Sequence, residues 1–324
     1  MTTQDTGSAL VAGLSGIIRG KAPQIELFVA CYLSGGHVLI EDAPGLGKTT
    51  LAKALARLVG DGSGAARFAR IQCTPDLLPY DITGVDVFNA GEGRFSFVPG
   101  PIFTDILLAD EINRATPKVQ SALLEVMAER QVSSGGVTRR VGDCFFVVAT
   151  QNPVESEGTY PLPAAQLDRF MVRLALGYPD EEAEVTVIHD DPAELLLPRL
   201  EPVVPLDAIR ASRAEQLEVY CHPDLERAIV RLVRATRERG DIKLGASPRA
   251  ALHLLHVARA LALMRGRDWV EDQDVIDVAP AGIAHRLVPF DPRTDCVSLA
   301  RSLALSVFAD LDRASARERR RPGP

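Results

Sequence analysis

The sequence is poor in lysine and has no long apolar run. Lysine occurs only at positions 21, 48, 53, 118 and 243, so a lysine within a motif stands out against the abundant arginine. No apolar stretch approaches the roughly 20 residues that a membrane-spanning helix needs. The first residues, MTTQDTGSAL, also lack the basic and then apolar order of a signal peptide. We therefore expect a cytoplasmic protein without a membrane span.

Cysteine spacing and net charge argue against further classes of function. The five cysteines lie far apart and without C-x-x-C spacing, which predicts neither a zinc site nor a disulfide framework. The net charge of −7 argues against nucleic acid as the main partner, because proteins that bind phosphate backbones usually carry a clear basic excess. An apolar fraction of 46% over 324 residues is enough for one large or two ordinary globular domains.

The sequence is organised around residues 38–50, VLIEDAPGLGKTT. Residues 38–40 predict a strand that is buried on both faces, and the apolar spacing of residues 51, 54, 55 and 58 predicts a helix that starts at Thr50. Between them lies a loop of small residues, whose backbone N–H groups can converge on phosphate beside a helix N-terminus. The nucleotide-binding residues predicted here are Asp42, Ala43, Pro44, Gly45, Leu46, Gly47, Lys48, Thr49 and Thr50.

Three residues of this loop have individual roles. Lys48 supplies a mobile cation, and the hydroxyl of Thr49 can ligate Mg²⁺. Asp42 stands where the general pattern G-x-x-x-x-G-K-[ST] has glycine. A carboxylate there would repel phosphate unless it points away from the loop.

A second apolar run, residues 106–109, ends in the acidic pair Asp110 and Glu111. Acidic residues at the carboxyl end of a buried parallel strand lie at the crevice where α/β proteins bind ligands. Asp110 is therefore predicted to hold Mg²⁺, and Glu111 to polarise the water that attacks the γ-phosphate. A strand predicted at 145–149 brings Asn152 to the same edge, where its amide can orient that water or contact phosphate.

Two arginines stand at the ends of predicted helices. Arg169 lies near the end of the segment AAQLDRF, beside Asp168, and considered alone it indicates either a surface ion pair or an arginine placed favourably against a helix C-terminus. Arg249 follows Ser247 and Pro248 at a helix start, where an arginine opposes the helix dipole. This position predicts that an anion lies close to Arg249.

The order of the predicted elements gives an α/β core followed by helices. The predicted strands are at 38–40, 68–72, 106–109, 145–149 and 172–176, with projecting hairpins at 85–98 and 131–141. The predicted C-terminal helices are at 206–219, 223–239, 248–265, 271–287 and 296–312. The predicted domains are a nucleotide-binding core over 1–178, a linker over 179–205 with room for one helix, a helical domain over 206–313 and a flexible basic tail over 314–324.

At this level of detail the sequence resembles AAA+ ATPases, and more narrowly the MoxR family, from about residue 11 to residue 312. The motifs that carry the resemblance are APGLGKT at 43–49, ILLADEINRATPKVQSALLEVMAE at 106–129, VVATQNPVESEGTYPLPAAQLDRF at 147–170 and GASPRAAL at 245–252. The third motif is highly specific to the family. The resemblance implies a P-loop core with a parallel sheet and a helix-2 insert hairpin, followed by an all-α helical lid.

The resemblance also implies the cofactors, ATP and Mg²⁺, and the roles of the site residues. The roles are Lys48 and Thr49 as Walker A contacts, Asp110 and Glu111 as the Walker B pair, Asn152 as sensor 1, Arg169 as an arginine finger for the neighbouring subunit's ATP, and Arg249 as sensor 2. Thr49 and Asp110 would hold the metal. Asp42 is tolerated in an EDxPG variant of the family's loop.

The chain contains no second catalytic motif, so its work must be done on another molecule. By resemblance, it is a chaperone-like motor that remodels or matures a partner protein with a von Willebrand factor A domain, by metal or cofactor insertion or by complex assembly. An arginine that serves a neighbouring subunit implies a ring, with a hexamer as the expected size. The alternatives are a DNA-acting helicase or translocase, the motor subunit of a metal chelatase, and a nucleotide-gated scaffold without turnover.

Overall fold

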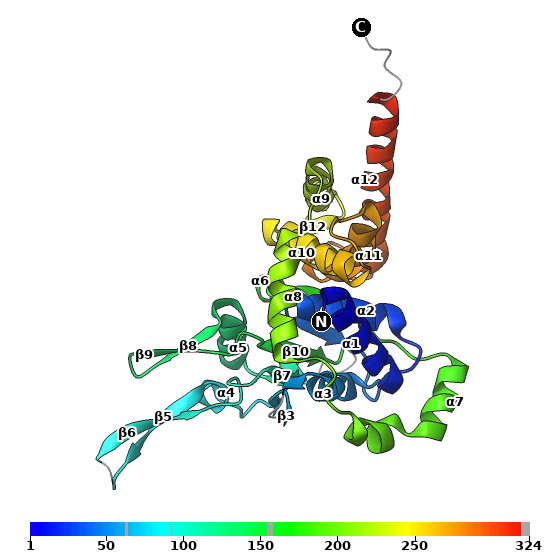
Figure 1. The fold of residues 1–324 in the computed structure, drawn as a ribbon. Helices are drawn as coiled ribbons and strands as arrows, with labels where there is room; N and C mark the ends of the chain where they lie inside the picture. The colour runs from blue at the N-terminus through cyan, green and yellow to red at the C-terminus, as the bar shows by residue number, and fades with distance from the viewer. Residues whose placement is uncertain (62–63, 92, 154–157, 319–324) are drawn as a thin grey trace.

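Five parallel strands form the central sheet (Figure 1). They are β1 (Val38–Glu41), β4 (Phe68–Gln72), β7 (Ile106–Asp110), β10 (Phe146–Gln151) and β11 (Val172–Leu174). Their spatial order is β11-β1-β10-β7-β4, and the computed structural model describes residues 1–61, 64–91, 93–153 and 158–318. All five predicted strands are confirmed, and the carboxyl end of β1 lies where the strand order reverses, the place at which open α/β sheets bind ligands.

Alternation along the central strands divides the core into two apolar clusters. On β1, Val38 and Ile40 point to one cluster and Leu39 to the other. On β7, Leu108 joins the first cluster and Leu107 the second. The sheet is therefore buried on both faces, as the continuous apolar runs predict for parallel strands.

Helices cover both faces of the sheet. The first cluster includes residues of α1 (Thr3–Ile17), α2 (Ala22–Leu33) and α3 (Lys48–Leu58), and the second includes residues of α4 (Pro79–Thr83) and α5 (Pro117–Glu129). Gly20, which has a left-handed backbone (φ 70°) that favours glycine, lies between α1 and α2 and separates them. A short turn, η1 (Ile112–Arg114), links β7 to α5.

Two long hairpins extend away from the body of the molecule (Figure 1). They are β5 (Gly84–Asn89) with β6 (Arg94–Pro99), and β8 (Gln131–Ser134) with β9 (Val137–Arg140). Asp86 of the first hairpin accepts a hydrogen bond from Ser134 Oγ at 2.7 Å, and the Arg139 guanidinium lies 3.9 Å from the ring centre of Phe97. Both predicted hairpins are confirmed, and these contacts tie one to the other. A two-residue ladder, β2 (Gly60–Asp61) with β3 (Gly64–Ala65), follows α3.

The segment predicted as a linker is largely helical. It contains α7 (Glu181–Asp190), a π-helical turn η2 (Pro192–Leu196) and a 3-10 turn η3 (Leu197–Arg199). The side chain of Asp180 caps α7 by accepting the N–H of Ala183 at 2.8 Å. This segment is therefore more ordered than its proline content predicts.

Helices dominate the C-terminal part, as predicted. They are α8 (Leu206–Glu218), α9 (Pro223–Ala235), α10 (Pro248–Met264), α11 (Asp272–Ile283), the turn η4 (Ala284–Arg286) and α12 (Cys296–Glu318). This part also contains an antiparallel pair of short strands, β12 (Ile242–Leu244) and β13 (Val288–Pro289), which the helical periodicity of the sequence did not predict. The last helix, predicted to end at residue 312, runs to Glu318, and the rest of the predicted tail, 319–324, lies outside the described residues.

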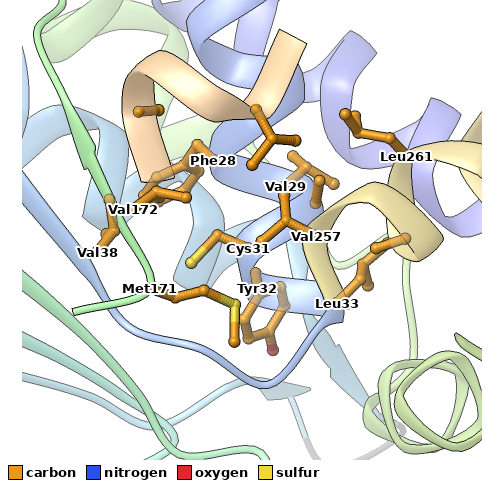
Figure 2. Packing of buried hydrophobic residues seen from close by; sticks show 14 of the residues in the cluster. Phe28, Val29, Cys31, Tyr32, Leu33, Val38, Met171, Val172, Val257 and Leu261 are labelled. Atoms are coloured by element: carbon orange, nitrogen blue, oxygen red, sulfur yellow. The ribbon is translucent and has the colours of Figure 1, made fainter. Parts of the chain in front are cut away.

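The C-terminal helices pack directly on the N-terminal ones. Figure 2 shows Val257 and Leu261 of α10 in one apolar cluster with Val29 and Leu33 of α2. An ion pair of 3.1 Å between Arg265 and Glu26 joins the same two elements. The division of the chain into core, linker and lid stays a prediction. In the ranges that the structure describes, no helix is both long and apolar enough to cross a membrane.

Candidate nucleotide-binding site

The loop after β1 turns sharply into α3. Gly45 and Gly47 both have left-handed backbone conformations, with φ of 81° and 82°. A Cβ at Gly45 would meet open space, so the backbone conformation rather than crowding demands glycine there. The helix begins at Lys48, two residues before the predicted start, and this places its free N–H groups at the loop. Pro44 and Gly45 are exposed at the crest of the loop.

Lys48 folds back over the loop. Its ammonium donates hydrogen bonds to the backbone carbonyls of Asp42 and, at 3.0 Å, of Ala43. Burial lowers the pKa of Lys48, while the carboxylates of Asp42, Asp110 and Glu111 act in the opposite direction. Lys48, the only cationic residue among residues 42–50, therefore lies close enough to Asp110 and Glu111 to interact with them electrostatically.

The carboxylate of Asp42 points away from the turn that would hold phosphate. Its Oδ2 accepts the N–H of Gly177 at 2.6 Å, and its Oδ1 accepts the N–H of Ala43 at 3.0 Å. The backbone N–H of Asp42 in turn donates to Gln151 at 3.1 Å. These bonds explain how the loop accommodates an acid where the general pattern has glycine, and they tie the loop to β10 and β11.

Asp110 and Thr49 face each other across the end of the sheet. Thr49 Oγ1 lies 3.5 Å from Asp110 Oδ2, and Asp110 Oδ1 accepts the hydroxyl of Thr150 at 2.6 Å. Thr150 Oγ1 also accepts the backbone N–H of Glu111 at 2.9 Å. Glu111 has a left-handed backbone (φ 55°), which is uncommon for a residue with a side chain and is held here by its neighbours.

Two polar residues of β4, which the sequence analysis did not select, contact the acidic pair. Arg70 donates to Asp110 Oδ2 from Nε at 3.2 Å and from a terminal nitrogen at 2.7 Å. Gln72 accepts a bond from Arg70 at 2.6 Å and donates to Glu111 at 3.0 Å. Arg114 of η1 pairs with the same Glu111 carboxylate at 3.2 Å. The sequence did carry a signal for them: Arg70 and Gln72 are polar, lie two positions apart and therefore share one face at the end of the strand predicted at 68–72.

Thr49 and Asp110 fit Mg²⁺ in donor type. Both are hard oxygen donors, and adjacent ligands of an octahedral Mg²⁺ lie about 3 Å apart, close to the distance between these two atoms. Because Asp110 Oδ2 also accepts from Arg70, a metal ion on that oxygen competes with the guanidinium.

Asn152 follows β10 at the same edge of the sheet and is buried. Its neighbour Gln151 pairs in register with Glu41, the residue just before the loop. The structure therefore brings Asn152, Thr49, Asp110 and Glu111 to one end of three adjacent strands, as predicted.

A cavity of about 200 Å³ adjoins the loop. Gly45, Leu46, Gly47 and Thr50 form one wall. The opposite walls come from the end of α1, from Gly177 and Pro179 after β11, and from the segment predicted as a linker. Their apolar lining residues are Ile17, Ile18, Val187, Pro192 and Ala193.

Arg169 and Arg249 lie together, away from the loop. Both line a cavity of about 290 Å³ that also includes Arg130 and His253. Residues 35–37, which precede β1, line it too, so the cavity lies at the amino end of the strand whose carboxyl end carries the loop. Within the described part of the chain, the guanidinium groups of Arg169 and Arg249 form no hydrogen bond or ion pair.

Asp168 does not pair with Arg169, so that interpretation of the sequence is wrong. Its carboxylate pairs instead with the buried Arg286 at 2.8 Å and accepts the hydroxyl of Ser247 at 2.9 and 3.0 Å. Asp168 is therefore already occupied and does not supply the anion predicted for Arg249. The anion expected near Arg249 therefore stays a prediction.

Three histidines near this cavity are held in the neutral form. Burial lowers the pKa of His37 and His285 well below the usual value, with nearby Arg130 and Arg286, respectively, adding to the effect. Burial and then Arg286 lower the pKa of His253 to about 3. His37 Nδ1 accepts the N–H of Val147 at 3.0 Å, which fixes its proton on Nε2.

We expect these histidines to make the fold sensitive to mild acid. In the unfolded chain each has a pKa of about 6.5, so below that pH the unfolded state binds more protons and stability falls. The three together should lower the free energy of unfolding by about 4 kcal/mol between pH 7.5 and pH 5.5. Urea denaturation at both pH values measures this. The variant His37→Gln should lose about a third of the difference, and equal stability at both pH values would contradict the expectation.

Comparison with known proteins agrees with the geometry. A model of the ATPase family associated with various cellular activities (AAA) matches residues 37–172, and a model of the AAA lid domain matches residues 234–301. The chain is 44% identical over 292 residues to Chaperone MoxR1 of Mycobacterium tuberculosis (strain ATCC 25618 / H37Rv), covering 87% of this chain and 76% of that protein. It is 33% identical to Protein MoxR of Paracoccus denitrificans, covering 93% of this chain and 94% of that protein.

A solved structure has the same fold over nearly the whole length. The crystal structure of a protein from Cytophaga hutchinsonii ATCC 33406 matches with a TM-score of 0.83 and 35% identity, covering 95% of this chain and 94% of that chain. AAA families bind nucleotide, in keeping with the loop after β1. The sequence motifs, the strand order and these matches together show that the chain belongs to the MoxR family of AAA+ ATPases.

Proposed function

We propose that this chain binds ATP with Mg²⁺ in the loop between β1 and α3 and hydrolyses it. The observation that carries the proposal is the convergence of Lys48, Thr49, Asp110, Glu111 and Asn152 at the carboxyl ends of β1, β7 and β10. The N–H groups of residues 45–50 bind the phosphates, and Lys48 leaves its carbonyl partners to contact them. Thr49 and Asp110 would hold Mg²⁺, which would supply positive charge to neutralise the phosphates.

In this proposal Glu111 and Asn152 act on the attacking water. The Glu111 carboxylate polarises the water as a general base, and the Asn152 amide orients it toward the γ-phosphate. The adenine base occupies the cavity beside the loop, between Ile17 and Ile18 on one side and Val187 and Pro192 on the other. The segment over 179–205 is then part of the nucleotide site.

Arg169 and Arg249 act on the nucleotide of a neighbouring subunit. Their cavity is separated from the protomer's own loop by β1, whose four residues span about 13 Å. Two arginines that pair with no acidic residue in the described ranges suit the γ-phosphate of a nucleotide that another copy presents. Hydrolysis would then require an oligomer, and a hexameric ring places one nucleotide at every junction.

The energy of hydrolysis is used to remodel or mature a partner protein. The similarity to Chaperone MoxR1 supports a chaperone role, and the described residues contain no group of three potential metal ligands that would indicate separate metal chemistry. The hairpin β5–β6 carries two exposed aromatic rings, Phe88 and Phe95, which contact each other and offer an apolar surface for binding a polypeptide. The partner we propose carries a von Willebrand factor A domain, and the event is metal or cofactor insertion or complex assembly.

Replacing Lys48 with alanine tests the nucleotide site. The variant should bind ATP at least about 10-fold more weakly, because a charge-assisted contact to phosphate is lost. Titration with a fluorescent ATP analogue measures the affinity, and phosphate release measures turnover. Lys53→Ala, an exposed lysine of the same helix, is the control and should bind normally. Equal affinity in wild type and Lys48→Ala would place the nucleotide elsewhere.

Capture of partners tests the remodelling role. An immobilised Glu111→Gln variant in Mg·ATP should retain a protein with a von Willebrand factor A domain, and the same variant without nucleotide should release it. Captured proteins are identified by mass spectrometry. Retention that does not depend on ATP, or the absence of such a domain among the retained proteins, would contradict the proposed partner while leaving the ATPase proposal intact.

A further inference from the structure

Arg286 is a buried arginine that forms hydrogen bonds to the chain on both sides of Arg169. Its side chain, in the turn η4, is 2% exposed. Its Nε donates to the Asp168 carboxylate at 2.8 Å, and one terminal nitrogen donates to the Phe170 carbonyl at 2.7 Å. Arg286 therefore holds the residue before Arg169 and the residue after it.

The same guanidinium reaches the helix that carries Arg249. A terminal nitrogen of Arg286 donates to His253 Nδ1 at 2.7 Å, and His253 lies one helical turn after Arg249 on α10. Ser247, two residues before Arg249, donates its hydroxyl to Asp168. Arg169 and Arg249 are thus tied to one hydrogen-bonded unit, which we call the Arg286 clamp: Arg286, Asp168, His253 and Ser247.

The hydrogen-bonding groups of the Arg286 clamp can hold their partners in a fixed arrangement. A guanidinium is planar and has five donors, so it can hold several acceptors in a rigid arrangement, which an ammonium cannot. Burial keeps His253 neutral, with its pKa near 3, so Nδ1 remains an acceptor over the physiological range. The Ser247 hydroxyl makes no cap for α10 and is instead committed to Asp168.

We propose that Arg286 is a positioning residue that fixes the spacing and direction of Arg169 and Arg249, so that both act as one unit on the neighbouring subunit's nucleotide. This inference rests on the function proposed above for those two arginines. Arg286 itself touches no nucleotide. A buried ion pair is by itself weak evidence of a stabilising role. Arg286 contacts the residues before and after Arg169, and also His253 on the helix of Arg249, and these contacts indicate a positioning role.

Kinetic variants separate positioning from mere stabilisation. In Arg286→Gln, kcat should fall about 10- to 100-fold while the Kd for ATP stays within about twofold, because misplacing a catalytic group by 1 Å is enough for such a loss. Ser247→Ala removes only the hydroxyl that grips Asp168 and should lower kcat about threefold or more. Arg267→Gln is the matched control, since Arg267 pairs with the buried Asp274 far from the clamp, and it should keep kcat while losing thermal stability.

The decisive comparison uses the background Arg169→Ala, Arg249→Ala. With both arginines gone there is nothing left to position, so adding Arg286→Gln or Ser247→Ala should change kcat by less than about twofold. A further loss in that background overturns the inference. Wild-type kcat in Ser247→Ala also overturns the inference, and this variant serves as the test if Arg286→Gln does not fold. If Arg169→Ala and Arg249→Ala themselves keep wild-type kcat, the proposed function of the arginines fails instead.

Discussion

Replacing Glu111 with glutamine is expected to leave ATP binding intact and to lower kcat at least about 100-fold. The amide is nearly the same size as the carboxylate and can still bond Gln72, but it cannot take a proton from the attacking water. Glu111 directly follows β7. Its left-handed backbone, whose N–H donates to Thr150 Oγ1, keeps the side chain at the carboxyl edge of the sheet. Phosphate release at saturating ATP measures kcat, and calorimetric titration measures the affinity for ATP.

The matched control for this prediction is Glu41→Gln. Glu41 ends β1, which β10 separates from β7, and it pairs at 2.8 Å with Arg173 of β11, on the side away from the acidic pair. The same change there should alter kcat by no more than about threefold, because the carboxylate is already paired with Arg173 and does not face the attacking water. Wild-type turnover in Glu111→Gln would show that another group activates the water.

Replacing Arg169 with alanine is expected to lower kcat about 10³- to 10⁵-fold, the range in which arginine fingers act. Affinity for ATP should change little, since the arginine serves a nucleotide bound by another protomer. The side chain has no partner within the described residues to lose, so stability should be unaffected. Steady-state hydrolysis, nucleotide titration and thermal unfolding of the purified variant measure the three quantities.

Arg227→Ala is the control for Arg169. Arg227 is an exposed arginine of α9 that pairs with Asp224 at 2.8 Å, and its loss should leave hydrolysis unchanged. If Arg169→Ala lost ATP binding rather than hydrolysis, the residue would serve its own protomer, and the proposed junction would be wrong.

The parts of the site that the sequence could predict are those set by short contiguous stretches. The loop with Lys48 and Thr49 lies within one strand-turn-helix unit, and Asp110 with Glu111 directly follows an apolar run. Parallel strands place their carboxyl ends at one edge, so the meeting of these stretches follows from the strand assignment. The roles of Arg169 and Arg249 came only from the family resemblance, because the position of Arg249 by itself predicted a nearby anion but no role, and Arg169 by itself indicated no function.

The remaining features depend on contacts between distant parts of the chain. The orientation of Asp42 is set by the N–H of Gly177, 135 positions away, and the partner of Asp168 is Arg286, 118 positions away. Arg70 reaches Asp110 only because β4 lies next to β7. Prolines in 179–205 indicated a linker with room for one helix, and they gave no sign that Val187 and Pro192 line the cavity beside the loop. Local patterns carry no information on such neighbours.

Mixing two inactive variants measures whether one active site is shared between two protomers. Lys48→Ala lacks the phosphate contact and Arg169→Ala lacks the arginine for its neighbour, so each alone should hydrolyse almost no ATP. When equal amounts are mixed and allowed to exchange subunits, about a quarter of the junctions pair an intact loop with an intact Arg169, and hydrolysis should recover to that extent. A mixture that stays as inactive as its components, although mass photometry shows mixed oligomers, would contradict the shared site.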